Sequence, residues 1–212
     1  MSRAYIFDLD GTLVNSLAGI AGSLNRALAR YDLPLHGESA VRGFIGDGAR
    51  MLAQRALPPG VSDGLLEKIV TAFAEDYGRT WADGTVAYPG IPELLDQLSK
   101  GASRLAVLSN KPHGFTTEIV EKIFPENTFT VVLGNREGLP HKPDPQGALE
   151  VCHALGVYPE DATLIGDSTM DLETAGNAGM KCIAVTWGYH DRERLLGAEH
   201  VVDSVEELAG LL

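Results

Sequence analysis

Six short apolar runs, separated by stretches of helical periodicity, most constrain what this chain can fold into. None of the runs alternates apolar with polar residues, a pattern that favours strands buried on both faces. Strands that alternate with helices form right-handed βαβ units, so we predict an α/β fold with a doubly wound (Rossmann-like) parallel sheet. The predicted strands are Ala4–Phe7, Leu105–Leu108, Phe129–Leu133, Thr163–Ile165, Cys182–Val185 and His200–Val202. The predicted intervening helices are Ile91–Lys100, Thr116–Phe124, Pro145–Leu155 and Leu172–Ala178.

The interval 15–85 departs from this alternation, because we find no convincing strand in it. Its periodicity predicts helices over 17–30, 48–57 and 65–81, separated by proline and glycine turns. We therefore predict a core made of residues 1–14 and 86–212, with an α-helical cap inserted after the first strand at 15–85. An insertion at the carboxyl end of a strand lies beside the crevice where open α/β sheets bind ligands, so it could act as a lid.

The overall charge excludes several classes of function. The formal net charge is −12, and such a field repels phosphodiester backbones and anionic lipid, which argues against nucleic-acid or membrane-surface binding. No stretch approaches the roughly 18 apolar residues that span a bilayer, and the first residues lack the pattern of a signal peptide. We expect a cytoplasmic protein that acts on a small molecule, and the sequence leaves monomer and homodimer open.

Two carboxylates follow the first predicted strand directly. The segment is Asp8-Leu9-Asp10-Gly11-Thr12. Two carboxylates this close repel each other when both are ionised, unless a cation lies between them or one keeps its proton. Gly11 allows a sharp turn, and Thr12 can hydrogen-bond across it. This motif directly after an N-terminal apolar strand indicates a catalytic loop.

Three further polar clusters stand at the ends of other predicted strands. Ser109-Asn110 offers a hydroxyl and backbone amides of the kind that bind phosphate oxygens. Lys142, before Pro143-Asp144-Pro145, places a cation at the start of a helix, where anions are favoured. Asp167 and Asp171 are one helical turn apart. All four clusters fall at the carboxyl ends of strands in one predicted parallel sheet, which should bring them together.

These four clusters resemble, in order, the motifs of the haloacid dehalogenase-like hydrolase superfamily. The resemblance covers essentially the whole chain. Within the superfamily, the chain is similar to the phosphoglycolate phosphatase group. The segments that carry this closer likeness are Phe44-Ile45-Gly46-Asp47-Gly48-Ala49, Ser109-Asn110-Lys111-Pro112-His113 and Trp187-Gly188-Tyr189.

The resemblance implies a Mg²⁺-dependent phosphatase for a small phosphorylated metabolite, with 2-phosphoglycolate as the suggested substrate. Asp8 would be the nucleophile that forms an aspartyl-phosphate, and Asp10 would give and take the leaving-group proton. Magnesium would be bound by Asp8, Asp167 and the Asp10 carbonyl, with Asp171 as a ligand or support. The expected phosphate-binding residues are Thr12, Ser109, Asn110 and Lys142.

Two residues are candidates for recognising the part of the substrate beyond the phosphate. Arg50 in the cap could bind a carboxylate bidentately, and His113 could border the cleft.

Other activities need different residues from those of a phosphatase. A carbon–halogen hydrolase would need neither Asp10 nor a metal, and a Schiff-base phosphonate hydrolase would need a cap lysine. The alternatives that stay open are a sugar-phosphate mutase of the same superfamily and a phospho-accepting regulatory domain without turnover.

Overall fold

A computed structural model describes residues 3–101 and 103–212, and the chain divides into two compact units. The first, called the core unit here, comprises the chain up to Val14 together with Ala87–Leu212. The second, called the helical unit, is Asn15–Val86. The chain passes between them at two short strands that pair with each other, β2 (Val14–Asn15) and β3 (Val86–Ala87).

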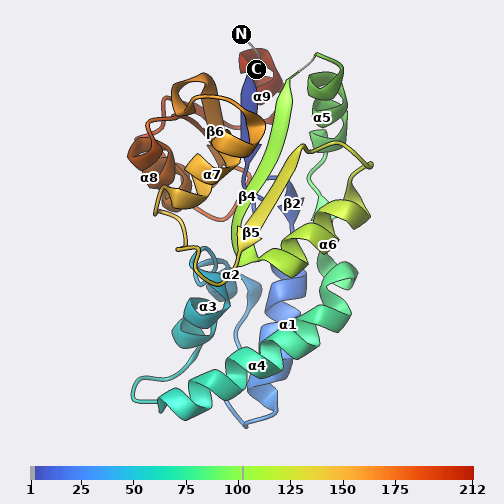
Figure 1. The fold of residues 1–212 in the computed structure, drawn as a ribbon. Coiled ribbons are helices and arrows are strands. Elements are labelled where there is room, and N and C mark those ends of the chain that lie inside the picture. The colour runs from blue at the N-terminus through green and yellow to red at the C-terminus, as the bar shows by residue number, and fades with distance from the viewer. Residues whose placement is uncertain (1–2, 102) are drawn as a thin grey trace. The chain divides into compact units, whose positions relative to one another are not determined.

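The core unit contains the predicted parallel sheet (Figure 1). Its six strands lie in the order β5-β4-β1-β6-β7-β8, and every described pair is parallel. From β1 in the middle, the chain adds β4 and β5 on one side and the last three strands on the other. This reversal confirms the doubly wound fold class. The strands are β1 (Ala4–Phe7), β4 (Arg104–Pro112), β5 (Val131–Asn135), β6 (Ala162–Gly166), β7 (Lys181–Val185) and β8 (His200–Val202).

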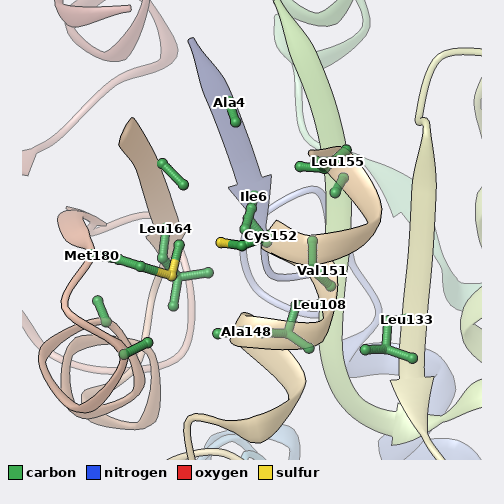
Figure 2. Packing of buried hydrophobic residues seen from close by; sticks show 14 of the residues in the cluster. Ala4, Ile6, Leu108, Leu133, Ala148, Val151, Cys152, Leu155, Leu164 and Met180 are labelled. Atoms are coloured by element: carbon green, nitrogen blue, oxygen red, sulfur yellow. The ribbon is translucent and has the colours of Figure 1, made fainter. Parts of the chain in front are cut away.

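Helices cover both faces of this sheet, as its buried strands require. Side chains of α7 and α8 pack on β1, β4 and β6 in one apolar cluster; Figure 2 shows Val151, Cys152 and Leu155 of α7 turned toward the strands. Helices α5 and α6 lie on the opposite face (Figure 1). The helices are α5 (Ile91–Lys100), α6 (His113–Ile123), α7 (Gln146–Leu155), α8 (Thr169–Ala178) and α9 (Val205–Leu211), with 3₁₀ turns η2 (Pro159–Asp161) and η3 (Arg192–Arg194).

One strand, β4, is longer than predicted. We expected the strand at 105–108 to end before Ser109, but β4 continues to Pro112, so Ser109 and Asn110 lie within it. Its register against β5 shifts between Leu108 and Pro112. Such an irregularity lets a strand bend while it continues. The polar residues at its end do not continue the apolar run from which the strand was predicted. The other predicted strands and core helices are present with ends shifted by at most three residues, and α9 was not predicted.

The helical unit contains the predicted helices and one that is too short to show periodicity. Helix α4 contacts α1 and α3, and Leu24, Ile69 and Phe73 are among the buried apolar side chains of this unit. Its elements are α1 (Leu17–Ala29), α2 (Glu38–Arg42), α3 (Gly48–Ala56), α4 (Asp63–Thr80) and η1 (Trp81–Gly84). Across the described residues of both units, no helix has the length and apolarity needed to cross a membrane.

Candidate active site

Asp8 stands where the central strand ends. In the sheet register, Phe7 of β1 lies beside Val107 of β4 and Ile165 of β6, and the amide of Asp8 still donates to the Ile165 carbonyl at 2.8 Å. The Asp8 side chain therefore begins at the carboxyl edge of the sheet, between its two halves. Its Oδ1 accepts a hydrogen bond from the amide of Leu9 at 2.7 Å, and the residue is 8% exposed.

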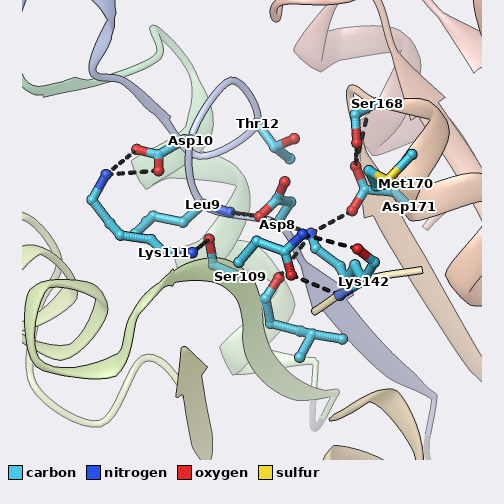
Figure 3. A network of polar contacts seen from close by, with 12 residues as sticks. Asp8, Leu9, Asp10, Thr12, Ser109, Lys111, Lys142, Ser168, Met170 and Asp171 are labelled. Carbon is cyan, nitrogen blue, oxygen red and sulfur yellow. Dashed lines mark hydrogen bonds and ion pairs between the residues drawn. The ribbon is translucent and has the colours of Figure 1, made fainter. Parts of the chain in front are cut away.

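Lys142 reaches Asp8 from the loop before α7. The ammonium is buried and lies 3.0 Å from Asp8 Oδ1 and 2.6 Å from Asp171 Oδ1 (Figure 3). The Asn110 side chain holds the backbone of Lys142 on both sides, since its Oδ1 accepts from the Lys142 amide at 2.7 Å and its Nδ2 donates to the Lys142 carbonyl at 3.1 Å. Asn110 therefore positions the lysine.

Asp171 is anchored at the start of α8. One of its oxygens, Oδ2, accepts from the amide of Ser168 at 3.1 Å and from its hydroxyl at 2.6 Å. This arrangement belongs to a capping box, in which the first residues of a helix satisfy one another's donors. With Oδ1 on Lys142, both oxygens of Asp171 are engaged.

Asp167 is held by two segments of the chain, the loop that follows Asp8 and the loop after β7. The Thr12 hydroxyl donates to its Oδ1 at 3.0 Å, and the Tyr189 amide donates to its Oδ2 at 2.7 Å. The backbone at Gly11 and Gly188 approaches so closely that a Cβ at either position would lie 2.3 Å from Asp167 Oδ2. The indole of Trp187 also donates to the Thr12 carbonyl at 3.1 Å, which ties the loop after β7 to the Asp8 loop.

Burial and mutual repulsion set the charge state of these acids. Burial raises the pKa of the Asp8 carboxyl to about 7, although Lys142 opposes this, and the charge of Asp171 adds to it. Burial, together with the charges of Asp8 and Asp171, raises the pKa of Asp167 well above its ordinary value. Burial lowers the pKa of Lys142, but the charges of Asp171 and Asp8 outweigh it, so the net shift is upward and the amine stays an ammonium.

The same three acids fit a divalent cation. Asp8, Asp167 and Asp171 each offer a carboxylate oxygen, and these oxygens lie within 4.8 Å of one another. One ammonium does not balance three carboxylates, and an oxygen-only donor set suits hard cations such as Mg²⁺. Asp171 already holds the Lys142 ammonium on Oδ1, whereas Asp167 accepts from the uncharged Thr12 hydroxyl and Tyr189 amide. Asp8 and Asp167 are therefore the better ligands and Asp171 the better support.

Asp10 is paired with a lysine that the sequence did not single out. Lys111 Nζ lies 2.9 Å from Asp10 Oδ1 and 2.7 Å from its Oδ2 (Figure 3). The two residues are 101 positions apart in the chain, and no local pattern signals such a partner. The close approach of Gly188 to Asp167 was missed for the same reason.

The remaining candidates lie in different surroundings. Ser109 is buried, and its hydroxyl accepts from the Lys111 amide at 3.3 Å. His113, the first residue of α6, accepts at Nδ1 from the amide of Gly134 at 3.2 Å, so its ring is fixed against β5. Arg50 belongs to α3 of the helical unit, where it forms an ion pair with Glu67 of α4 and both side chains are more than half exposed. Its predicted recognition role remains a prediction.

The core cluster can therefore support nucleophilic chemistry on an anionic group. A buried carboxylate, a fixed ammonium and a cation-binding set of acids lie at one edge of the sheet. Asp10 stands two residues from Asp8 with its carboxylate fixed by Lys111. Such groups provide a nucleophile, charge compensation and a proton carrier within one site.

Comparison with known proteins agrees with this geometry. Residues 5–185 match the family model of haloacid dehalogenase-like hydrolases. The phosphoglycolate phosphatase of Pseudomonas putida is 34% identical over 217 residues, which cover 100% of this chain and 79% of that protein. The Salmonella typhimurium phosphoglycolate phosphatase is 33% identical over 228 residues, covering 97% of this chain and 90% of its own length.

The fold comparison points the same way. The crystal structure of a predicted phosphoglycolate phosphatase from Haemophilus somnus superimposes with a TM-score of 0.91 at 29% identity. The match covers 99% of this chain and 97% of that one. Together with the four motifs and their meeting at the carboxyl edge of the sheet, these matches show that the chain belongs to the haloacid dehalogenase-like hydrolases, in the phosphoglycolate phosphatase-like group.

Proposed function

We propose that this protein is a Mg²⁺-dependent phosphatase that hydrolyses 2-phosphoglycolate through an aspartyl-phosphate on Asp8. The observation that carries the proposal is the buried Asp8 carboxylate, held between the Leu9 amide and the Lys142 ammonium beside Asp167 and Asp171. Only local positive charge allows a carboxylate to meet a phosphate dianion in a protein of net charge −12. The neighbours of Asp8 supply part of that charge.

In the first half of the reaction, an Asp8 oxygen attacks phosphorus and the bond from phosphorus to the ester oxygen breaks. The departing oxygen takes a proton from Asp10. In the second half, water attacks the phosphorus of the aspartyl-phosphate and gives a proton to Asp10. The bond from phosphorus to the Asp8 oxygen breaks, so orthophosphate leaves and the Asp8 carboxylate is restored. Two displacements replace one difficult step, and one acid serves both halves.

Asp8 and Asp167, with the Asp10 carbonyl, would hold the metal, and Asp171 would support them through Lys142 and Ser168. When bound, Mg²⁺ would neutralise the acids and attract the phosphoryl group. Lys142 and Ser109 are the proposed contacts for the phosphoryl oxygens. Asn110 acts through Lys142, whose backbone it holds, and Thr12 acts through Asp167, to which its hydroxyl donates.

The substrate assignment rests on the relatives, two of which are phosphoglycolate phosphatases by name. We assign the helical unit the role of a cap domain, because it is inserted directly after the Asp8 loop. A cap favours small phosphorylated metabolites over phosphoproteins as substrates.

Orthophosphate release from a panel of phosphomonoesters tests the proposal. The panel contains 2-phosphoglycolate, pyrophosphate and hexose phosphates, each with Mg²⁺ and with a chelator. We expect repeated, Mg²⁺-dependent turnover that is fastest with 2-phosphoglycolate. Labelling that stops at one phosphate per chain would instead indicate a regulatory domain, and interconversion of hexose phosphates would indicate a mutase.

A further inference from the structure

Lys111 is a buried cation whose role in the active site is not explained by the proposed chemistry. It lies on β4, its side chain is 7% exposed, and its ammonium contacts both oxygens of Asp10 (Figure 3). Enclosing a lysine costs side-chain entropy and desolvation. A lysine in this position therefore needs a reason beyond packing.

The position of Lys111 relative to the substrate follows from Asp10. In the proposed reaction, the Asp10 carboxyl lies within hydrogen-bond reach of the ester oxygen, at about 2.6–3.2 Å. Lys111 Nζ is 2.7 Å from the same carboxyl group. The ammonium is then only one carboxyl group away from the ester oxygen, within reach of a short group attached to that oxygen. In 2-phosphoglycolate, a single methylene separates that oxygen from a carboxylate.

We propose that Lys111 determines substrate specificity by binding the carboxylate of 2-phosphoglycolate. This inference rests on the proposed function and adds the residue that selects the substrate. Each of the two buried lysines would bind one anionic end of the substrate. Lys142 is placed on Asp8, at the phosphoryl end, and Lys111 is placed on Asp10, at the end of the leaving group.

An ammonium suits this task because it carries three N–H donors. It can bind the substrate carboxylate while it keeps a bond to Asp10. Without Lys111, the substrate carboxylate would be enclosed with no compensating positive charge, and an unpaired anion in a buried site is costly. A phosphomonoester with an alkyl leaving group would place only apolar atoms there and would gain nothing from the ammonium.

Steady-state kinetics on a matched pair of substrates test this inference. Ethyl phosphate has a methyl group where 2-phosphoglycolate has its carboxylate. Lys111→Met should lower kcat/KM for both substrates by a shared factor, which measures the effect of Lys111 on Asp10. It should lower kcat/KM for 2-phosphoglycolate by a further 10- to 100-fold, about the loss expected for one charge-assisted hydrogen bond. An equal loss for the two substrates would overturn the inference.

Two variants and one binding measurement complete the design. Lys122→Met removes an exposed lysine of α6 and should leave both kcat/KM values unchanged. Lys111→Arg should restore part of the preference for 2-phosphoglycolate. In an Asp8→Asn background, Lys111→Met should weaken binding of 2-phosphoglycolate more than binding of ethyl phosphate, so slow turnover cannot hide the result. A wild-type enzyme without phosphatase activity would refute the proposed function and this inference together, whereas normal activity with equal losses refutes only the inference.

Discussion

The core unit and the helical unit each bury carboxylates, but they stabilise them in opposite ways. In the helical unit, Asp76 of α4 is 6% exposed and accepts from Arg26 Nε at 2.8 Å. Burial raises the Asp76 pKa, but its hydrogen bond and charge pairing with Arg26 outweigh this, so the pKa lies below its ordinary value. In the core unit, burial raises the pKa of Asp8 and Asp167, and the neighbouring acids add to the effect.

The difference separates a carboxylate that supports the fold from carboxylates that support chemistry. Asp76 has a matched arginine, so its charge is satisfied without any ligand. Asp8 and Asp171 share one lysine, and Asp167 beside them accepts from a hydroxyl and an amide. The excess negative charge of the three acids requires a proton or a metal. Crowded acids with raised pKa values are common at functional sites, because folding alone would not select them.

The largest expected effect comes from Asp8→Asn. This change removes the nucleophile, so we expect phosphate release to fall by a factor on the order of 10⁴ or more. It also removes one of three crowded charges, so the free energy of unfolding of the metal-free protein should not decrease. Activity assays and chemical denaturation measure the two quantities. Normal turnover would refute the mechanism, and a large loss of stability would show that Asp8 supports the fold as Asp76 does.

Gly188→Ala tests the positioning of Asp167 without changing any charge. The added Cβ would lie 2.3 Å from both Cβ and Oδ2 of Asp167, so the carboxylate or the loop after β7 must move. We expect Mg²⁺ affinity, measured by calorimetry, to fall by about 10- to 100-fold, as for other groups that orient metal ligands.

The matched control for this change is Gly176→Ala in α8, where a Cβ would meet no atom within 4 Å. Alanine is the better helix former, so this variant should be slightly more stable and should bind Mg²⁺ normally. Equal Mg²⁺ affinity in the two variants would mean that the loop after β7 does not position Asp167.

Asp76→Asn should lower stability and leave phosphate release unchanged, the reverse of the result for Asp8→Asn. It leaves Arg26 facing a neutral amide, and because the Arg26 side chain is about half exposed, water compensates part of the loss. We expect the free energy of unfolding to fall by about 1 kcal/mol. Phosphate release at a temperature where the variant is folded should match that of the wild type. A loss of activity without a loss of stability would break the distinction between the two units.

Much of the fold and part of the site could be predicted from the sequence. Near-continuous apolar runs identified the parallel sheet, and parallel strands bring their carboxyl ends to one edge whatever their distance in the chain. Asp8, Lys142 and Asp167 were therefore recognisable from the strands that precede them. The short strands β2 and β3 span only two residues each, which is too few to show any period.

The contacts that orient the site could not be predicted, because they join residues that are far apart in the chain and no local sequence pattern marks them. Nothing local to Lys111 indicates that it faces Asp10, and nothing local to Gly188 indicates that it touches Asp167. Nothing local to Asn110 indicates that its amide holds the Lys142 backbone, and its phosphate-binding role stays a prediction. Sequence patterns report which residues gather at an edge, whereas hydrogen-bond partners depend on the register and bend of each strand.

The smallest expected effect is a difference in how the two units respond to pH. Because the folded pKa of Asp8 is about 7 against an ordinary 3.8, the metal-free folded state binds the extra proton between these values. Its contribution to the free energy of unfolding is thus complete below about pH 4 and is lost as the pH rises through about 7. Asp76, whose pKa is lowered, contributes above its ordinary value and loses that contribution only in acid.

Urea denaturation between about pH 5 and about pH 8 in a chelator should therefore show stability falling with pH, with a slope of at most about 1.4 kcal/mol per pH unit for each proton that Asp8 or Asp167 gives up. Asp8→Asn should flatten the slope, and Asp76→Asn should leave it unchanged in this range. Saturating Mg²⁺ should reverse the trend, because the metal binds the ionised acids and displaces their protons. A slope that survives both Asp8→Asn and Mg²⁺ would place its origin outside the crowded acids of the core unit.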